Sequence, residues 1–145
     1  MNILVINGPN LNLLGLREPE IYGRENYDIL VQKLHAWAKE EGMALTVFQS
    51  NHEGAIVDTI QEAYGKYDGI VINPAAYTHT SVAILDALKA VMIPAVEVHI
   101  SEVSEREPFR QISYAGMACV KTITGLGFEG YHQALLFLKE YLKNK

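Results

Sequence analysis

Short apolar runs alternate with longer amphipathic segments along the chain, and this alternation constrains the fold more than any other feature. The apolar runs have the length of buried strands, whereas the amphipathic segments repeat their apolar residues with the period of a helix. We expect strands at 3–6, 45–49, 69–73, 95–100 and 120–124, and helices at 27–42, 53–67 and 131–142. A further helix, capped by Thr80 or Ser81, carries the apolar stripe Ile84, Leu85, Leu88 and Val91. The polar segment 101–111 is expected to hold at most one short helical turn.

Five strands that alternate with helices predict an α/β fold, in which helices cover both faces of a parallel sheet through right-handed crossovers. The flavodoxin-like strand order 2-1-3-4-5 suits this count best and gives a three-layer sandwich. No internal repeat, low-complexity tract or linker interrupts the pattern, so we expect a single domain over residues 1–145. In such sheets, ligands bind beyond the carboxyl ends of the strands, where the strand order reverses.

Charge and composition argue against several functional classes. The net charge of −5 opposes binding to nucleic acid or to anionic membranes. No stretch approaches the roughly 20 apolar residues that span a bilayer, and the first apolar run is too short for a signal peptide. We therefore expect a cytoplasmic protein. Cys119 is the single cysteine, which excludes an intrachain disulfide and favours a small core residue.

The sequence predicts neither a metal nor an organic cofactor. No set of His, Cys, Asp and Glu has metal-ligand spacing. Glycines at 125, 127 and 130 form a loose Gly-x-Gly-x-x-Gly, but they follow the last expected strand, whereas a dinucleotide site follows the first.

Polar and basic side chains gather where the expected strands end. A long loop, 7–24, follows the first strand, and Asn51, His52, Asn73 and His99 stand at the ends of later ones. All four arginines lie in two such loops: Arg17, Arg24, Arg106 and Arg110. Arginine suits carboxylates and hydroxyl-rich ligands, so this placement favours an anionic substrate. The alternative is that the arginines form surface ion pairs with Glu18, Glu105 and Glu107.

Glu97 and His99 are two residues apart in a strand and therefore share a face. A carboxylate beside a histidine fixes its tautomer and favours its protonated form, as a general acid requires. A purely structural Glu–His pair is the alternative, although buried charges in a central strand are costly unless they are paired.

The chain resembles the type II 3-dehydroquinate dehydratases along essentially its whole length. The matching motifs are NGPNLNLLG at 7–15, REPEIYG at 17–23, SNHEG at 50–54, INPAAYTH at 72–79 and EVHIS at 97–101. The resemblance implies anti-elimination of water from 3-dehydroquinate through an enolate, without a cofactor. It also implies a homododecamer, a tetramer of trimers.

The same resemblance implies a role for each matching residue. Tyr22 would be the base, Arg17 would stabilise transition-state charge, and His99, held by Glu97, would protonate the departing hydroxyl. Asn10 would stabilise the enolate through a water. The substrate-binding set would be Asn73, the amides of Ile100 and Ser101, His79, Arg110, Asp86 from a neighbouring subunit, and Arg106 at the edge.

Elementary electrostatics supports Tyr22 as a base. An ordinary tyrosine has a pKa of about 10, so forming tyrosinate at neutral pH costs about 4 kcal/mol. A nearby cation lowers such a pKa by roughly 1–3 units, and Arg17 is close enough in sequence to do this.

Two departures from the family pattern concern loops. Glu102 replaces a common asparagine and would oppose a substrate carboxylate unless Arg106 pairs with it. The segment 114–118 lacks a proline that many members carry, which bears on loop shape or subunit packing rather than chemistry.

Two other functions remain open from the residues alone. One is a non-catalytic flavodoxin-like module that binds a mononucleotide or a carboxylate. The other is Schiff-base dehydration by a lysine, for which Lys121 is the one candidate in an expected strand.

Overall fold

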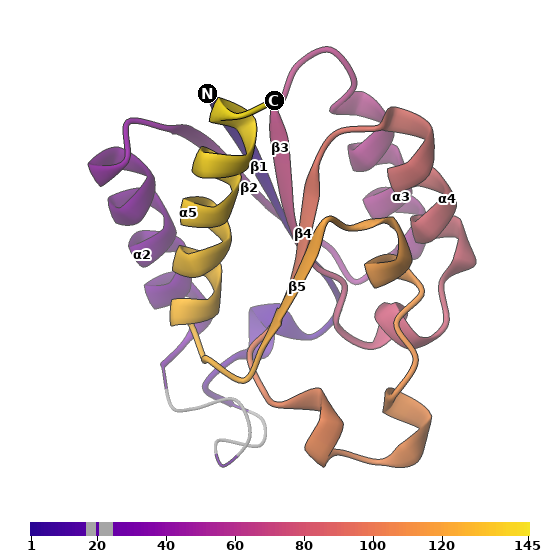
Figure 1. Ribbon diagram of the computed structural model, residues 1–145. Helices are drawn as coiled ribbons and strands as arrows, with labels where there is room; N and C mark the ends of the chain where they lie inside the picture. The colour runs from indigo at the N-terminus through magenta and orange to yellow at the C-terminus, as the bar shows by residue number, and fades with distance from the viewer. Residues whose placement is uncertain (17–19, 21–24) are drawn as a thin grey trace.

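A computed structural model describes residues 1–16, 20 and 25–145 of the chain. Five parallel strands form one sheet in the order β2-β1-β3-β4-β5 (Figure 1), which confirms the predicted fold class and strand order. The strands are β1 (Asn2–Asn7), β2 (Ala44–Gln49), β3 (Gly69–Asn73), β4 (Ala95–His99) and β5 (Lys121–Thr124). The carboxyl ends of all five strands therefore meet at one edge of the sheet.

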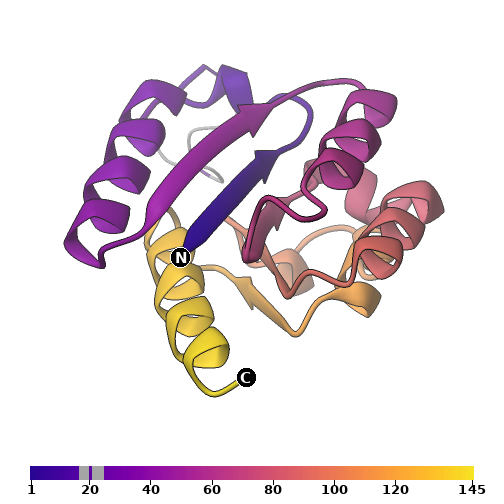
Figure 2. The ribbon, with the colours of Figure 1, turned by 90° about the horizontal axis from the view of Figure 1, so that it is seen from above.

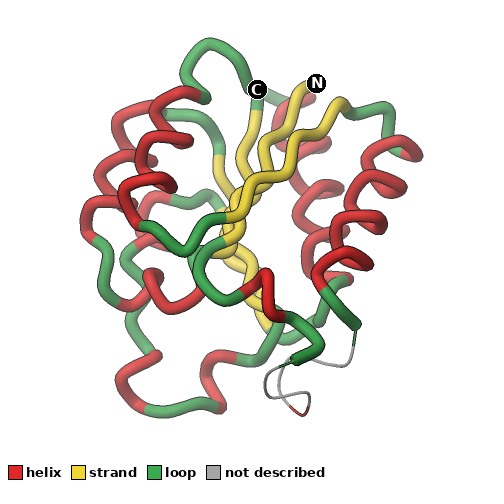
Figure 3. The backbone as a smooth tube through the Cα atoms, turned by 180° about the vertical axis from the view of Figure 1, so that it is seen from behind, coloured by secondary structure: helices red, strands yellow, loops and turns green. Residues whose placement is uncertain are grey.

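Helices cover both faces of this sheet. The part of the chain that the structure describes includes the α-helices α2 (Tyr27–Glu40), α3 (Glu53–Glu62), α4 (Val82–Val91) and α5 (Glu129–Lys143). Helices α2 and α5 lie on one face and α3 and α4 on the other (Figures 1 and 2), so that two helical layers flank the strands (Figure 3). None of the helices in the described ranges is long and apolar enough to cross a membrane.

Alternation along β1 explains the two-sided core. Ile3 and Val5 pack with the α2 and α5 side, whereas Leu4 and Ile6 pack with the α3 and α4 side. A strand that buries its side chains on both faces needs apolar residues at successive positions. The sequence of β1 is therefore a continuous apolar run without polar alternation.

Several local predictions need correction. The segment 101–111 holds two 3-10 turns, Val103–Glu105 and Pro108–Arg110, rather than at most one. The Glu102 side chain caps the first turn, and Pro108 begins the second with a backbone angle already suited to a helix. Ser81 alone caps α4, through a bond from the Ile84 amide, because Thr80 ends the preceding 3-10 turn Ala75–His79.

The ends of β1 and β3 approach each other closely at Gly8. Its amide donates to the Asn73 carbonyl at 2.8 Å, and a Cβ at this position would lie 2.4 Å from the Pro74 carbonyl oxygen. Only glycine therefore allows the two chain segments to meet where the strand order reverses.

We expect Gly8→Ala to lower the free energy of unfolding by about 3 kcal/mol, since the added methyl would push two backbone segments apart. Gly54→Ala is the matched control: nothing lies within 4 Å of its added Cβ, and alanine favours the helix there. Chemical denaturation of both variants measures the difference. Equal stability of the two would contradict this account of Gly8.

Candidate active site

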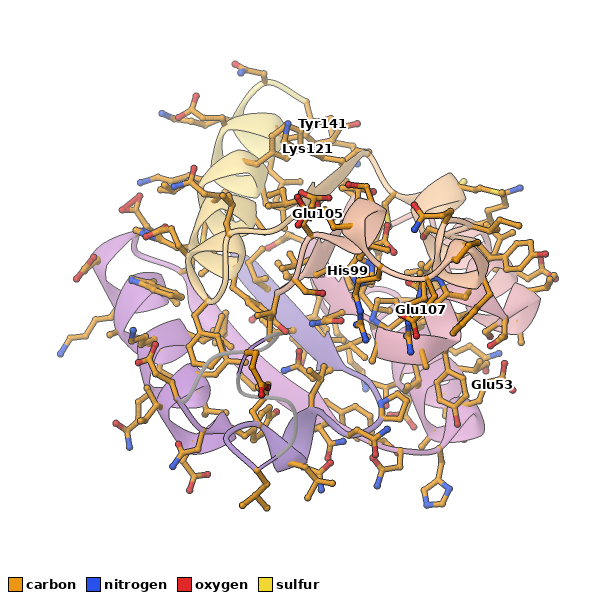
Figure 4. The ribbon with its side chains drawn as sticks, turned by 90° about the horizontal axis from the view of Figure 1, so that it is seen from below. Glu53, His99, Glu105, Glu107, Lys121 and Tyr141 are labelled. Atoms are coloured by element: carbon orange, nitrogen blue, oxygen red, sulfur yellow. The ribbon has the colours of Figure 1, made fainter. Side chains whose placement is uncertain are left out.

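A cavity of about 240 Å³ opens at the carboxyl edge of the sheet, where the strand order reverses between β1 and β3. Its size suits a small metabolite rather than a dinucleotide. The predicted site residues that line it are Asn10, Asn73, His79, His99, Ile100, Ser101, Arg106 and Arg110. Figure 4 looks at this edge from below, with His99 towards the middle of the face.

Four predicted site residues are not among the described residues that line this cavity, and one of them, Glu97, contacts His99 instead. Asp86 is exposed on α4 and does not line the cavity. Arg17 and Tyr22 lie outside the described residues, as does Arg24. Residues that line the cavity without having been predicted are Pro9, Leu11, Ala75, Ala76 and Val103, whose apolar character gave no chemical signal.

Glu97 and His99 form the hydrogen-bonded pair that their spacing predicted. His99 Nε2 lies 2.7 Å from Glu97 Oε2, and the Glu97 side chain is fully buried while His99 reaches the cavity. A carboxylate can only accept, so Nε2 carries a proton and donates it to this bond. Nδ1 is then the ring nitrogen left to exchange a proton with a ligand.

Three hydroxyls complete the surroundings of Glu97. Thr78 and Ser113 each donate to Oε2 at 2.6 Å, and Thr122 donates to Oε1 at 2.9 Å. Gly116 makes room for the group, because a Cβ there would lie 2.7 Å from Oε1. Nothing local in the sequence signals this arrangement, since the donors stand 16 to 25 residues away along the chain.

These donors keep Glu97 ionised. Burial alone would raise the pKa of this carboxyl, but the hydrogen bond and charge of His99, with the hydroxyls of Ser113 and Thr78, outweigh it and lower the pKa to about 2. The side chain is therefore an anion that orients His99 at every working pH.

Because the Glu97 pKa is lower in the folded protein than its ordinary 4.5, the carboxylate stabilises the fold above that pH. This contribution is lost as the pH falls from about 4.5 towards 2. We expect the free energy of unfolding of Glu97→Gln to be lower than that of the parent by on the order of 3 kcal/mol at pH 7. This difference should shrink as the pH falls from about 4.5 to about 2. Urea unfolding followed by Trp37 fluorescence measures it, with the exposed Glu62→Gln as control. A gap that stays constant down to pH 2 would contradict the assignment.

The two arginines of the cavity contact Glu107. Arg110 Nε lies 3.0 Å from Glu107 Oε1, and Arg106 Nε lies 3.8 Å from the same atom. The ion-pair alternative is thus correct for Glu107, yet both arginines also line the cavity, so the two interpretations hold together. His79 is fixed by a 2.8 Å contact between Nδ1 and the Ile112 carbonyl.

Glu102 does not oppose a ligand in this cavity. Its Oε1 accepts from the hydroxyls of Ser104 and Thr124, each at 3.0 Å, and the residue does not line the cavity. The hydrogen bonds of Ser104 and Thr124 lower the pKa of Glu102. Glu102 is therefore held between the 3-10 turn Val103–Glu105 and the end of β5 rather than at the described wall of the cavity.

Asn10 is held in an unusual conformation by the end of β2. Its φ of 70° lies in the left-handed region, and its amide donates to Asn51 Oδ1 at 3.0 Å. Gln49 Nε2 donates to the same Asn51 oxygen at 3.2 Å and to the Gly8 carbonyl at 3.1 Å. Sequence reasoning placed Asn51 at a strand end but did not identify its partner.

The sequence model of the family described as dehydroquinase class II matches residues 1–139. This chain belongs to that family. A 3-dehydroquinate dehydratase of Clostridium perfringens is 52% identical over 146 residues, covering 100% of both chains. The catabolic 3-dehydroquinase of Aspergillus clavatus is 58% identical over 134 residues, covering 92% of this chain and 89% of the relative.

Solved structures of class II dehydroquinases share this fold. The type II dehydroquinase from Butyrivibrio crossotus superposes with a TM-score of 0.94 at 55% identity, covering 96% of this chain and 97% of its own. The type II dehydroquinase from Propionibacterium acnes superposes with a TM-score of 0.90 at 41% identity, and the match covers 98% of this chain and 96% of that enzyme. These relationships do not favour a non-catalytic binding module.

The lysine alternative also loses support from the geometry. Lys121 is exposed on the edge strand β5, away from His99 in Figure 4, and its Nζ lies 5.3 Å from the centre of the Phe137 ring. It does not line the cavity, so it is not placed to form a Schiff base there.

Proposed function

We propose that this chain converts 3-dehydroquinate to 3-dehydroshikimate by eliminating water, the dehydratase step of the shikimate pathway. The observation that carries the proposal is the Glu97–His99 pair at the wall of a polar cavity, in a member of the class II dehydroquinase family. A buried anion behind a histidine is what a general acid needs when a hydroxyl must leave as water.

The reaction divides into two proton transfers. Tyr22, as phenolate, removes the proton next to the ketone, and the electrons of the broken C–H bond form an enolate. Collapse of the enolate breaks the C–O bond on the opposite face, and His99 supplies the proton that makes the leaving group water. Arg17 stabilises the charge that develops, and Asn10 stabilises the enolate through a water. Tyr22 and Arg17 enter this scheme from the family motif alone.

The remaining cavity residues hold the substrate. The side-chain amide of Asn73 and the backbone amides of Ile100 and Ser101 bind the carboxylate, while His79 and Arg110 bind ring hydroxyls and Arg106 contributes charge at the edge. These groups line one small cavity, which supports a common ligand. The reaction needs no metal or organic cofactor. Within the described ranges, no group of three or more His, Cys, Asp and Glu is placed to hold a metal ion.

Asp86 acts from a neighbouring subunit in this proposal, which is consistent with its exposed position on α4. The chain then works as a single catalytic domain, residues 1–145, within a cytoplasmic dodecamer built as a tetramer of trimers. Light scattering tests this assembly, and a monomer that retains full activity would remove the role of Asp86.

Turnover of 3-dehydroquinate by the purified chain tests the function. Ultraviolet absorbance should rise on addition of substrate, because the product is conjugated and the substrate is not. Borohydride added with substrate should not inactivate the protein. No rise in absorbance would refute the dehydratase function, and borohydride inactivation would restore the lysine alternative.

A further inference from the structure

Tyr131 is a fully buried tyrosine that the proposed reaction does not use. It lies in the first turn of α5 with 0% of its surface exposed, and its hydroxyl reaches the junction of β1 and β3. At that junction Asn7 and Asn73 are direct register partners on adjacent strands, and both side chains bond to the Tyr131 oxygen. The tyrosine thus lies behind the point where the strand order reverses.

The hydrogen-bond directions around Tyr131 are fixed by one backbone amide. The Ala75 N–H can only donate, and it donates to Asn73 Oδ1 at 3.1 Å. Asn73 must then present Nδ2 to the Tyr131 oxygen, at 2.9 Å. The single Tyr131 proton is left for Asn7 Oδ1, at 2.7 Å, and Asn7 Nδ2 faces the hydroxyl of Tyr27 at 3.3 Å.

This chain of bonds sets what Asn73 offers to the cavity. Asn73 is 3% exposed and lines the cavity, and its Nδ2 has a second hydrogen besides the one given to Tyr131. With Oδ1 turned towards the Ala75 amide and one Nδ2 hydrogen given to Tyr131, the remaining Nδ2 hydrogen is the donor that Asn73 offers to a ligand. A donor suits the substrate carboxylate, whereas a flipped amide would present an oxygen and repel it.

We propose that Tyr131 is a positioning residue for substrate binding, which holds the Asn73 side-chain amide with a hydrogen aimed at the carboxylate of 3-dehydroquinate. The inference rests on the proposed function and extends it to a residue from the opposite end of the chain.

Burial keeps this tyrosine a neutral phenol. Desolvation raises the pKa of Tyr131 well above its ordinary value, more than the bond from Asn73 lowers it. The hydroxyl therefore accepts from Asn73 and donates to Asn7 at every pH at which the enzyme would work.

Tyr131→Phe tests the proposal because it removes the oxygen and keeps the ring. We expect KM for 3-dehydroquinate to rise about tenfold while kcat stays within about threefold, since the carboxylate contact is made equally in the ground and transition states. Tyr27→Phe is the matched control, because it removes only the hydrogen bond from Asn7 Nδ2 to the Tyr27 hydroxyl. In this variant, KM and kcat should each change less than twofold.

A double-mutant cycle shows whether Tyr131 acts through Asn73. In an Asn73→Ala background, Tyr131→Phe should change KM less than twofold, because the group that it positions is absent. A tenfold rise in both backgrounds, or no rise in either, would overturn the proposal. A purely structural role would instead lower stability and affect both backgrounds alike.

Asn7→Leu probes the same chain from its other end and serves if Tyr131→Phe does not fold. Without Asn7, the Tyr131 proton loses its acceptor, and the hydroxyl must compete with the Ala75 N–H for Asn73 Oδ1. This competition loosens the Asn73 amide, so KM should again rise about tenfold. Calorimetric binding of 3-dehydroshikimate to each variant separates this inference from the proposed function. Binding without turnover by the parent chain would refute the dehydratase function, and the Kd ratios would still decide the role of Tyr131. An unchanged Kd or KM in Asn7→Leu, or a parent chain that neither binds nor reacts, would overturn the inference.

Discussion

His99→Ala is expected to lower kcat by about 10²–10⁴-fold, the range that a positioned general acid contributes. The leaving hydroxyl would depart without a proton, while the groups that bind the carboxylate would remain, so KM should change little. The fold should survive, because Glu97 keeps the hydroxyls of Thr78, Ser113 and Thr122 as donors. Steady-state turnover of 3-dehydroquinate measures the loss.

A surface histidine gives the control for this variant. His35 is exposed on α2, and His35→Ala should turn over substrate at the parent rate. Added imidazole should restore part of the His99→Ala activity, since a small base can occupy the vacated volume and carry the proton. A His99→Ala variant with near-normal kcat would show that another group protonates the leaving hydroxyl.

Tyr22→Phe is expected to reduce kcat by about 10³-fold or more, because phenylalanine cannot remove the proton next to the ketone. Formation of the enolate would then depend on water, whose attack the site does not organise. Exchange of that proton with deuterated solvent should slow in parallel, which separates loss of the base from loss of the acid. In His99→Ala, by contrast, exchange should persist because the enolate still forms.

Tyr64→Phe controls for the loss of a hydroxyl elsewhere, since Tyr64 is 69% exposed after α3. Its rate should equal that of the parent chain. A phenol titration of parent and Tyr22→Phe should differ by one group that ionises well below the ordinary tyrosine range. Identical titrations with normal turnover in Tyr22→Phe would remove tyrosinate from the mechanism.

The order of motifs along the chain predicted which residues would face one cavity. Asn73 and His99 end two different strands, and parallel strands place their carboxyl ends at a common edge. These two residues, 26 positions apart in the sequence, were therefore expected to lie at the same cavity. Two-residue spacing in β4 likewise predicted that Glu97 would reach His99. These inferences succeeded because strand geometry is local and repeats along the chain.

Loop geometry was harder to predict because it depends on contacts between distant segments. Glu102 was expected near the ligand, but Thr124 from the next strand draws its carboxylate away. The second 3-10 turn of 101–111 was missed for a related reason. Gln111 Nε2 closes that loop by donating to the carbonyls of Val103, Arg106 and Glu107, and no periodic pattern encodes this.

The sequence by itself determined the class of fold, the strand order and the edge at which the candidate site lies, because apolar periodicity and strand-end residues are properties of short segments. Only the tertiary structure decided how the reacting groups are held. Tyr131 reaches Asn7 across 124 residues, and Glu97 accepts hydrogen bonds from hydroxyls in three separate segments of the chain. A hydrogen bond depends on distance and direction in space, and those are set only when the helices and strands have packed.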